Sequence, residues 1–214
     1  MRLKKRSLRL PRNIKYVSGE SVEYLELWKM YSSMPLPTSV KSVMLIGSPY
    51  FEQRKVGIMA GHALARLDME LRLANAVKDA GYRLIYKVHP GRTVEAEGIF
   101  DDKASILAGN VKDNLDKTDA FLCPSITTTA FSYALCTNRP IVTLDLNFHL
   151  YDPFPEAMEL FQKRCSIVKT WIDEGNRIIF SEKELLEALS KKPEEPNAGF
   201  LKTYMFPKRR LAIE

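Results

Sequence analysis

The chain lacks the sequence motifs of several large enzyme classes. Its 214 residues contain no G-x-G-x-x-G motif, which argues against a nicotinamide-dependent enzyme, and no G-x-x-x-x-G-K-[ST] motif, which argues against a P-loop NTPase. A G-x-S-x-G elbow is also absent, which disfavours a Ser/His/Asp hydrolase. The functional signal must therefore lie in other patterns.

Cysteine and long apolar runs are scarce. The three cysteines are an odd number and none forms a CxxC pair, so neither a disulfide framework nor a structural zinc site is expected. The N-terminus has no apolar signal region, and no apolar run approaches the ~20 residues that span a bilayer. We expect a cytoplasmic protein with reduced thiols that needs no metal or other cofactor.

Acidic residues are missing from one segment, and this explains the basic net charge of +6. Residues 1–15 hold seven basic side chains and no acid, which leaves 25 basic against 26 acidic side chains elsewhere. Such an arm is a candidate for contact with an anionic membrane surface, and a solvated tail or linker is the other interpretation. Nucleic acid is disfavoured as a partner because no aromatic platform or known binding motif is present.

Three regions can be distinguished along the chain. We expect residues 1–40 to be a basic arm and connector, with a short helix at 19–31 and an extended segment at the prolines of 35–37. Residues 41–190 are expected to form the folded domain, and residues 191–214 a C-terminal helix or tail.

Short apolar runs alternate with helical patterns between residues 42 and 144. A continuous apolar run such as 42–46 is typical of a strand buried on both faces, and the 3–4 spacing of apolar residues in 62–80 predicts a helix that Gly81 caps. Ser181 and Glu184 predict a capping box at a later helix. The alternation predicts an α/β domain with a doubly wound parallel sheet, a single Rossmann-like domain. The strands expected in this stretch are 42–46, 83–88, 104–107, 120–123 and 140–144.

Polar residues gather where three of these strands end, and ligands bind at such ends in doubly wound sheets. After the second strand, the imidazole of His89 and the guanidinium of Arg92 can bind phosphate, with Lys87 beside them and Pro90 fixing the turn. A histidine that only caps a turn is the alternative.

Four hydroxyls follow the 120–123 strand at the start of a helix: Ser125, Thr127, Thr128 and Thr129. A helix start offers free backbone N–H groups to an anion, and capping alone needs a single Ser or Thr, so the excess favours phosphate binding.

Weaker candidates lie elsewhere. Gly47 and Ser48 follow the first strand, where a glycine permits close approach of the backbone to a ligand. Asp145 ends a strand and is a candidate for contact with a ribose hydroxyl or a second substrate, and loop capping is the alternative. Asp68 and Glu70 are expected to be solvated helix residues. His62 is expected either to cap a helix or to face an acceptor site, and His149 is expected to pack in an aromatic-rich loop.

The spacing of two segments resembles the donor-binding half of GT-B glycosyltransferases. Residues 87–90 (Lys-Val-His-Pro) are similar to the family's K-x-H-P segment, and residues 119–131 followed by 139–142 are similar to its segment with a Ser/Thr pair. The resemblance covers about 42–145 and is strongest to capsule and surface-carbohydrate transferases of the Kdo, sialic-acid and polyol-phosphate types. It implies that His89, Ser125 and the threonines at 127–129 hold the phosphate of a nucleotide-sugar donor, with His89 as the candidate catalytic residue.

The chain departs from this family in two ways. The stretch 131–134 has no glutamate, which the family often places there against the donor's ribose. A chain of 214 residues holds only one of the two GT-B domains, so we expect the acceptor domain to be a missing segment or a partner subunit. The alternatives are a nucleotide-sugar 2-epimerase-like enzyme and a non-catalytic module that binds an anionic surface.

Overall fold

A computed structural model describes residues 21–48, 63–92, 97–147 and 155–207. The basic arm of residues 1–15 lies outside the described residues, as do His62 and His149.

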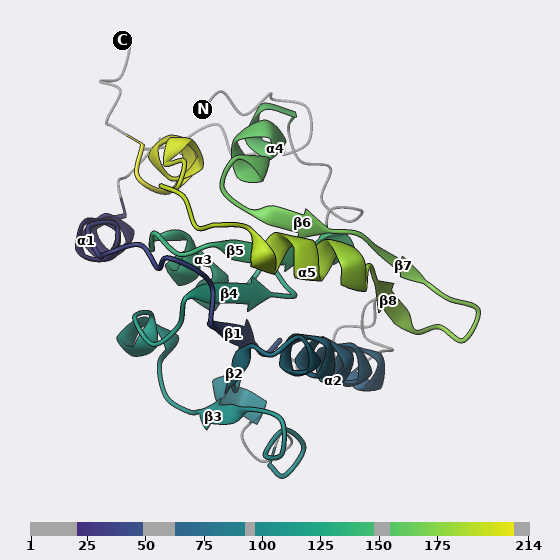
Figure 1. The fold of residues 1–214 in the computed structure, drawn as a ribbon. Helices are drawn as coiled ribbons and strands as arrows, with labels where there is room; N and C mark the ends of the chain where they lie inside the picture. Colours follow the sequence, from purple (N-terminus) through teal and green to yellow (C-terminus); the bar gives the residue numbers. More distant parts are fainter. Residues whose placement is uncertain (1–20, 49–62, 93–96, 148–154, 208–214) are drawn as a thin grey trace, which may run out of the picture.

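A six-stranded sheet forms the centre of the fold (Figure 1). Its order is β3-β2-β1-β4-β5-β6, and all five pairings are parallel, which confirms the predicted doubly wound α/β arrangement. A separate antiparallel hairpin, β7–β8, follows the last strand. The strands are β1 (Ser42–Ile46), β2 (Arg83–Lys87), β3 (Ser105–Leu107), β4 (Ala120–Cys123), β5 (Ile141–Leu144), β6 (Ser166–Val168), β7 (Thr170–Ile172) and β8 (Ile178–Phe180).

Helices cover both faces of the sheet. In Figure 1, α1 lies to the left of the sheet and α2 to its right. The helices are α1 (Val22–Tyr31), α2 (Ala63–Asp79), α3 (Thr129–Leu135), α4 (Pro155–Gln162) and α5 (Glu182–Ser190), with short 3₁₀ turns η3 (Pro90–Arg92), η4 (Val111–Asn114) and η5 (Asp145–Asn147) and a π-helical turn η6 (Leu201–Met205).

The central strands are apolar throughout because both of their faces are buried. Val43 and Leu45 of β1 pack in the cluster that includes Leu73 of α2 and Leu185 of α5. Alternate residues of the same strand, such as Met44, pack on the other face, in the cluster that contains residues of α3, α4 and η6. Successive side chains of a strand point to opposite faces, so a run of apolar residues supplies both layers.

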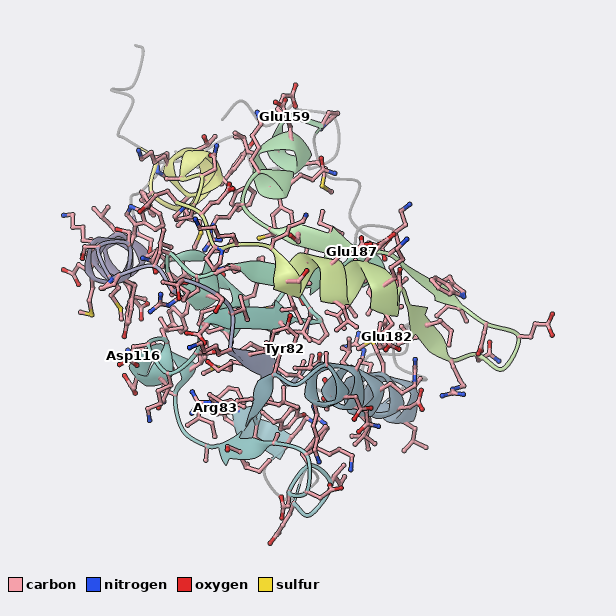
Figure 2. The ribbon with its side chains drawn as sticks, viewed as in Figure 1. Tyr82, Arg83, Asp116, Glu159, Glu182 and Glu187 are labelled. Carbon is pink, nitrogen blue, oxygen red and sulfur yellow. The ribbon has the colours of Figure 1, made fainter. Side chains whose placement is uncertain are left out.

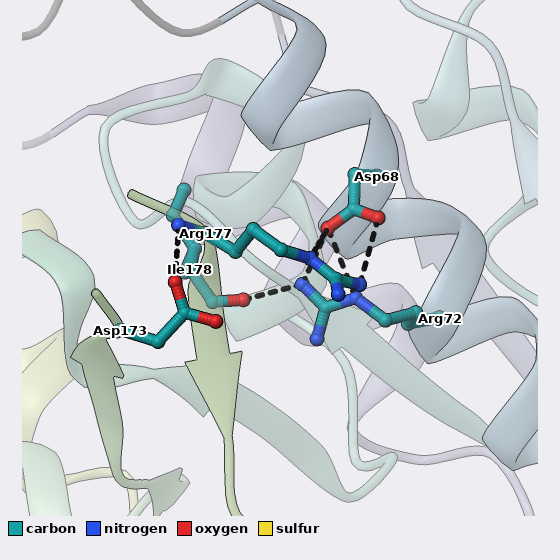
Figure 3. Close-up of polar contacts among 5 residues, drawn as sticks. All are labelled: Asp68, Arg72, Asp173, Arg177 and Ile178. Carbon is teal, nitrogen blue, oxygen red and sulfur yellow. Dashed lines mark hydrogen bonds and ion pairs between the residues drawn. The ribbon is translucent and has the colours of Figure 1, made fainter. Parts of the chain in front are cut away.

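An ion-paired cluster fastens the β7–β8 hairpin to α2 (Figure 3). Asp68 accepts from Arg72 Nη2 at 2.7 Å and pairs with Arg177 Nη2 at 3.2 Å. Arg72 also donates to the backbone oxygen of Ile178 at 2.5 Å. One carboxylate therefore joins a helix to a strand far away in the sequence.

Charged side chains cover the outer face of α5. Glu182 and Glu187 are exposed there, whereas Leu185 and Leu189 face the core (Figure 2). The helix begins at the N-cap Ser181, whose hydroxyl accepts from the Glu184 N–H. The predicted capping box is wrong in its second half, because the Glu184 carboxylate accepts from the Lys169 N–H instead.

A buried arginine closes the C-terminal end of α3. Arg164 is only 7% exposed, and its guanidinium donates to the backbone oxygens of Leu135, Thr137 and Arg139 at 3.3, 2.8 and 3.2 Å. Burial lowers its pKa from the usual value. A cation at this end satisfies carbonyls that have no partner within the helix.

Replacing Arg164 with Met should therefore lower the free energy of unfolding by about 3 kcal/mol, since buried carbonyls lose charged donors. Urea denaturation measures this change. The neighbouring exposed residue provides the control, because Lys163→Met removes only a surface ion pair with Glu159 and should change stability by less than about 1 kcal/mol. Equal effects of the two substitutions would contradict the capping role.

Candidate functional site

A cavity of about 560 Å³ opens at the carboxyl ends of the parallel strands. Its walls come from the segments that follow β1, β2, β3 and β4. The lining residues are Ile46, Gly47, Lys87, Val88, His89, Pro90, Gly109, Asn110, Val111, Thr127, Thr128, Thr129, Ala130 and Tyr133.

The cavity lies at the point where the strand order reverses. The chain leaves β1 toward β2 and β3 on one side, and later returns to place β4, β5 and β6 on the other. The segments after β1 and β4 therefore diverge to opposite faces and leave a crevice between them, which is the usual ligand position in open α/β sheets.

His89 stands at the cavity on the turn that follows β2. Its Nδ1 accepts from the Gly91 N–H at 3.2 Å, so in the neutral ring the proton is on Nε2. Burial lowers the pKa of His89, and the nearby cations of Arg92 and Lys87 lower it further, while Glu70 acts in the opposite sense. The ring is therefore neutral at pH 7 and can donate a hydrogen bond from Nε2.

The threonines after β4 have different roles. Thr128 is the N-cap of α3, and its hydroxyl accepts from the Phe131 N–H at 3.1 Å. The hydroxyls of Thr127 and Ser125 lie 3.0 Å apart and pair with each other. Thr127 and Thr129 are exposed and line the cavity, so their hydroxyls are the ones best placed for a ligand.

Lys87 places a buried cation in the cavity wall. Its side chain is 3% exposed, and Nζ donates to the Val88 backbone oxygen at 2.5 Å. Burial lowers the pKa of this ammonium group. A desolvated cation interacts with an anion more strongly than one in water, because the effective dielectric constant is lower.

A buried carboxylate connects the turns that follow β1 and β2. Glu70 of α2 is fully buried and accepts from the Ser48 N–H at 2.8 Å and the Tyr86 hydroxyl at 2.7 Å. Arg92 pairs with the same carboxylate at 3.2 Å and donates to the Ser48 backbone oxygen at 2.6 Å. The expectation that Glu70 is solvated is wrong, because its carboxylate turns inward to these donors.

Most, but not all, of the predicted site residues lie together. Gly47, Lys87, His89 and Pro90 line the cavity with the threonines at 127–129. Ser48, Arg92 and Ser125 do not appear in its lining, and Ser48 and Arg92 instead belong to the network around Glu70. Asp145 accepts from the Thr170 N–H at 2.7 Å, which is the loop-capping alternative.

Sequence patterns missed two of the lining residues, Tyr133 and Asn110. Tyr133 contributes from α3, and Asn110 contributes from the turn between β3 and η4. Gly109-Asn110 follows a strand in the same way as Gly47-Ser48, so its position beyond a third strand was the signal available in the sequence. Tyr133 gave no signal, because an aromatic residue inside a helix usually packs in the core.

The described residues contain no group of three His, Cys, Asp or Glu side chains that could hold a metal ion. None of the helices in these ranges has the length and apolarity needed to cross a bilayer.

The fold and the cavity together define an α/β domain with a cavity at its topological switch point. No protein-family profile matches the chain, and no curated protein does. The solved structures that are similar to part of it include two transferases from one organism. The Thermosulfurimonas dismutans KpsC beta Kdo 2,4 transferase has 17% identity and a TM-score of 0.39, over 57% of this chain and 43% of that chain. The KpsC beta Kdo 2,7 transferase of the same organism has 14% identity and a TM-score of 0.35, over 57% and 40%. The match spans less than half the length of either transferase, and it is a coarse likeness of fold.

Gly47 is required by its surroundings, and this can be tested. A Cβ at this position would lie 2.7 Å from the buried Tyr86 hydroxyl and 3.1 Å from the Lys87 backbone oxygen. Gly47→Ala should lower the free energy of unfolding by about 2 kcal/mol, because neither neighbour can withdraw freely. Gly175→Ala is the control, since its Cβ meets nothing nearer than 3.4 Å. Urea denaturation measures both variants, and equal free energies of unfolding for Gly47→Ala and Gly175→Ala would contradict the steric argument.

The lowered pKa of His89 predicts how stability depends on pH. The folded pKa lies below the unfolded value of about 6.5, so the unfolded chain binds more protons between the two values. His89 therefore contributes a loss of stability as the pH falls from about 6.5 toward the folded pKa. His89→Gln should remove this loss. In urea denaturation at pH 7.5, 6.5 and 5.5, the free energy of unfolding of the variant should therefore rise relative to that of the wild type as the pH falls. A relative fall would show that the predicted sign is wrong.

Proposed function

We propose that this chain is the donor-binding domain of a glycosyltransferase, which holds a CMP- or UDP-linked sugar for surface polysaccharide synthesis. One observation carries the proposal: His89 and the threonines at 127–129, from two separate strand ends, line a single cavity at the switch point of the sheet. Two such segments can hold the phosphate from both sides.

The chemistry follows from the donors that line the cavity. The Nε2–H of neutral His89 and the hydroxyls of Thr127 and Thr129 would donate to phosphate oxygens, and the buried Lys87 would add positive charge. During transfer, negative charge grows on the leaving phosphate as the bond to the sugar breaks. Donors fixed in advance stabilise that charge without reorganisation, and each can contribute a few kcal/mol to the transition state. On this proposal, His89 is the catalytic residue.

The size and composition of the cavity fit a donor but not a complete active site. A volume of about 560 Å³ lies within the ~300–1,000 Å³ range of small-molecule sites. The described lining contains no Asp or Glu that could take a proton from an acceptor hydroxyl. We therefore propose that the catalytic base and the acceptor site come from a second domain or a partner subunit, and that the basic arm at 1–15 can bring the enzyme to an anionic membrane surface.

Removing the imidazole tests the proposal directly. A thermal-shift screen against CMP, UDP, CDP and GDP should show at least one nucleotide that raises the melting temperature, because binding to the folded state stabilises it. Titration calorimetry of His89→Ala with that nucleotide should then show affinity at least about tenfold weaker, since a hydrogen bond to a charged group is lost. Thr127→Val should also weaken binding, whereas Thr203→Val, which replaces an exposed threonine of η6, should not.

Two outcomes would reject the proposal. One is that the wild type binds none of the nucleotides, and the other is that His89→Ala binds the nucleotide as tightly as the wild type does. Product analysis with a nucleotide-sugar separates group transfer from 2-epimerisation, since epimerisation leaves the nucleotide attached to the sugar. A non-catalytic anion-binding module would instead show binding that falls steeply with salt and is indifferent to the identity of the base.

A further inference from the structure

The wall of the cavity that α3 supplies contacts the N-terminal helix α1. The hydroxyl of Tyr133, a lining residue, lies 3.0 Å from Oε1 of Glu23 on α1. The ring of Tyr133 also packs edge-on against Tyr24, with centroids 5.8 Å apart. Helix α1 therefore fixes the position of an aromatic side chain at the cavity.

A second set of contacts fixes Glu23 itself. Its carboxylate lies 3.6 Å from Lys112 Nζ of η4, and the Tyr31 hydroxyl donates to the Lys112 backbone oxygen at 3.2 Å. Helix α1 thus contacts both the α3 wall and the η4 wall of the cavity. The chain after α1 is anchored as well, since Arg139 Nη1 donates to the Pro35 backbone oxygen at 2.7 Å.

The direction of the Tyr133–Glu23 hydrogen bond determines what the wall can recognise. A carboxylate can only accept, so the single hydroxyl proton of Tyr133 points to Glu23. The phenol stays protonated well above neutral pH, because burial and then the hydrogen bond to Glu23 raise its pKa. Toward any other partner, the Tyr133 oxygen can offer only lone pairs.

We propose that Tyr133 is a specificity-determining residue that accepts a hydrogen bond from the ligand, with Glu23 as the positioning residue that fixes this polarity. The inference rests on the proposed function, and it adds that the ligand must present an N–H or O–H group to this wall. The cavity is then polarised: the His89 side donates to an anion, and the Tyr133 side accepts from a neutral donor. In a nucleotide, the donor is an exocyclic amine of the base, a ring N–H such as the N3–H of uracil, or a ribose hydroxyl.

Single substitutions separate the two roles. Tyr133→Phe keeps the ring and removes the acceptor, so CMP affinity measured by calorimetry should fall about tenfold. Glu23→Gln can donate to the Tyr133 oxygen, which frees the phenol proton to turn toward the ligand. Selectivity for donor-bearing ligands should then shrink in Glu23→Gln, whereas Glu26→Gln, the same change at an exposed position of α1, should behave as the wild type. In the Tyr133→Phe background, Glu23→Gln should have no further effect on affinity, because it acts through Tyr133.

Three nucleotides identify the donor group. A wild-type preference for CMP over UMP that disappears in Tyr133→Phe assigns the exocyclic amine, and a preference for UMP over CMP that disappears in this variant assigns the ring N–H of uracil. A preference for CMP over 2′-deoxy-CMP that disappears in the same variant assigns the ribose hydroxyl. If wild type and Tyr133→Phe bind all three nucleotides equally well, the inference is overturned while nucleotide binding stands. If the wild type binds no nucleotide, the proposed function fails and the inference fails with it.

Discussion

The turns around the cavity depend on how the charge of Glu70 is satisfied. A fully buried carboxylate is costly unless donors surround it, and the Ser48 N–H, the Tyr86 hydroxyl and Arg92 all donate to it. These donors come from the ends of β1 and β2 and from η3, while Glu70 belongs to α2. Removing one partner would leave the others buried without compensation, so the arrangement tends to keep its geometry. The Gly47 and His89 turns thereby receive fixed positions, which a site that binds by preorganised donors requires.

The architecture could be predicted because the physical cause of each strand is local. A strand covered on both faces is a run such as 43–46, and the segments between such runs have helical spacing. Gly81 could be placed as a helix cap for the same reason, and its φ of +85° confirms it. Contacts distant in sequence could not be predicted. The second half of the Ser181 capping box failed because a backbone N–H of residue 169 took the Glu184 carboxylate. Local sequence rules could not predict this hydrogen bond, because residue 169 lies outside the helix.

The site shows the same division. The positions of His89 and Thr127 at strand ends could be predicted, since parallel strands bring their carboxyl ends to one edge. The environment of Arg92 could not, because a cation on a strand-end turn pairs with whichever acid the fold brings near, and here that acid is Glu70. The position of Tyr133 could not be predicted either, because its hydrogen-bond partner is distant in the sequence. Glu23 is 110 residues away and contacts Tyr133 because α1 packs against α3.

Positive charge reaches the cavity from buried side chains and not from the surface of the domain. Outside residues 1–15 the chain carries 25 basic and 26 acidic side chains, so no long-range attraction for anions is expected from its net charge. The cation that lines the cavity is Lys87, and burial lowers its pKa because water is withheld from the ammonium group. An anion in the cavity would restore part of the stabilisation that water no longer provides, and it would favour the protonated form of His89 in the same way. Anion binding at this position would therefore raise the pKa values of both side chains toward their ordinary values.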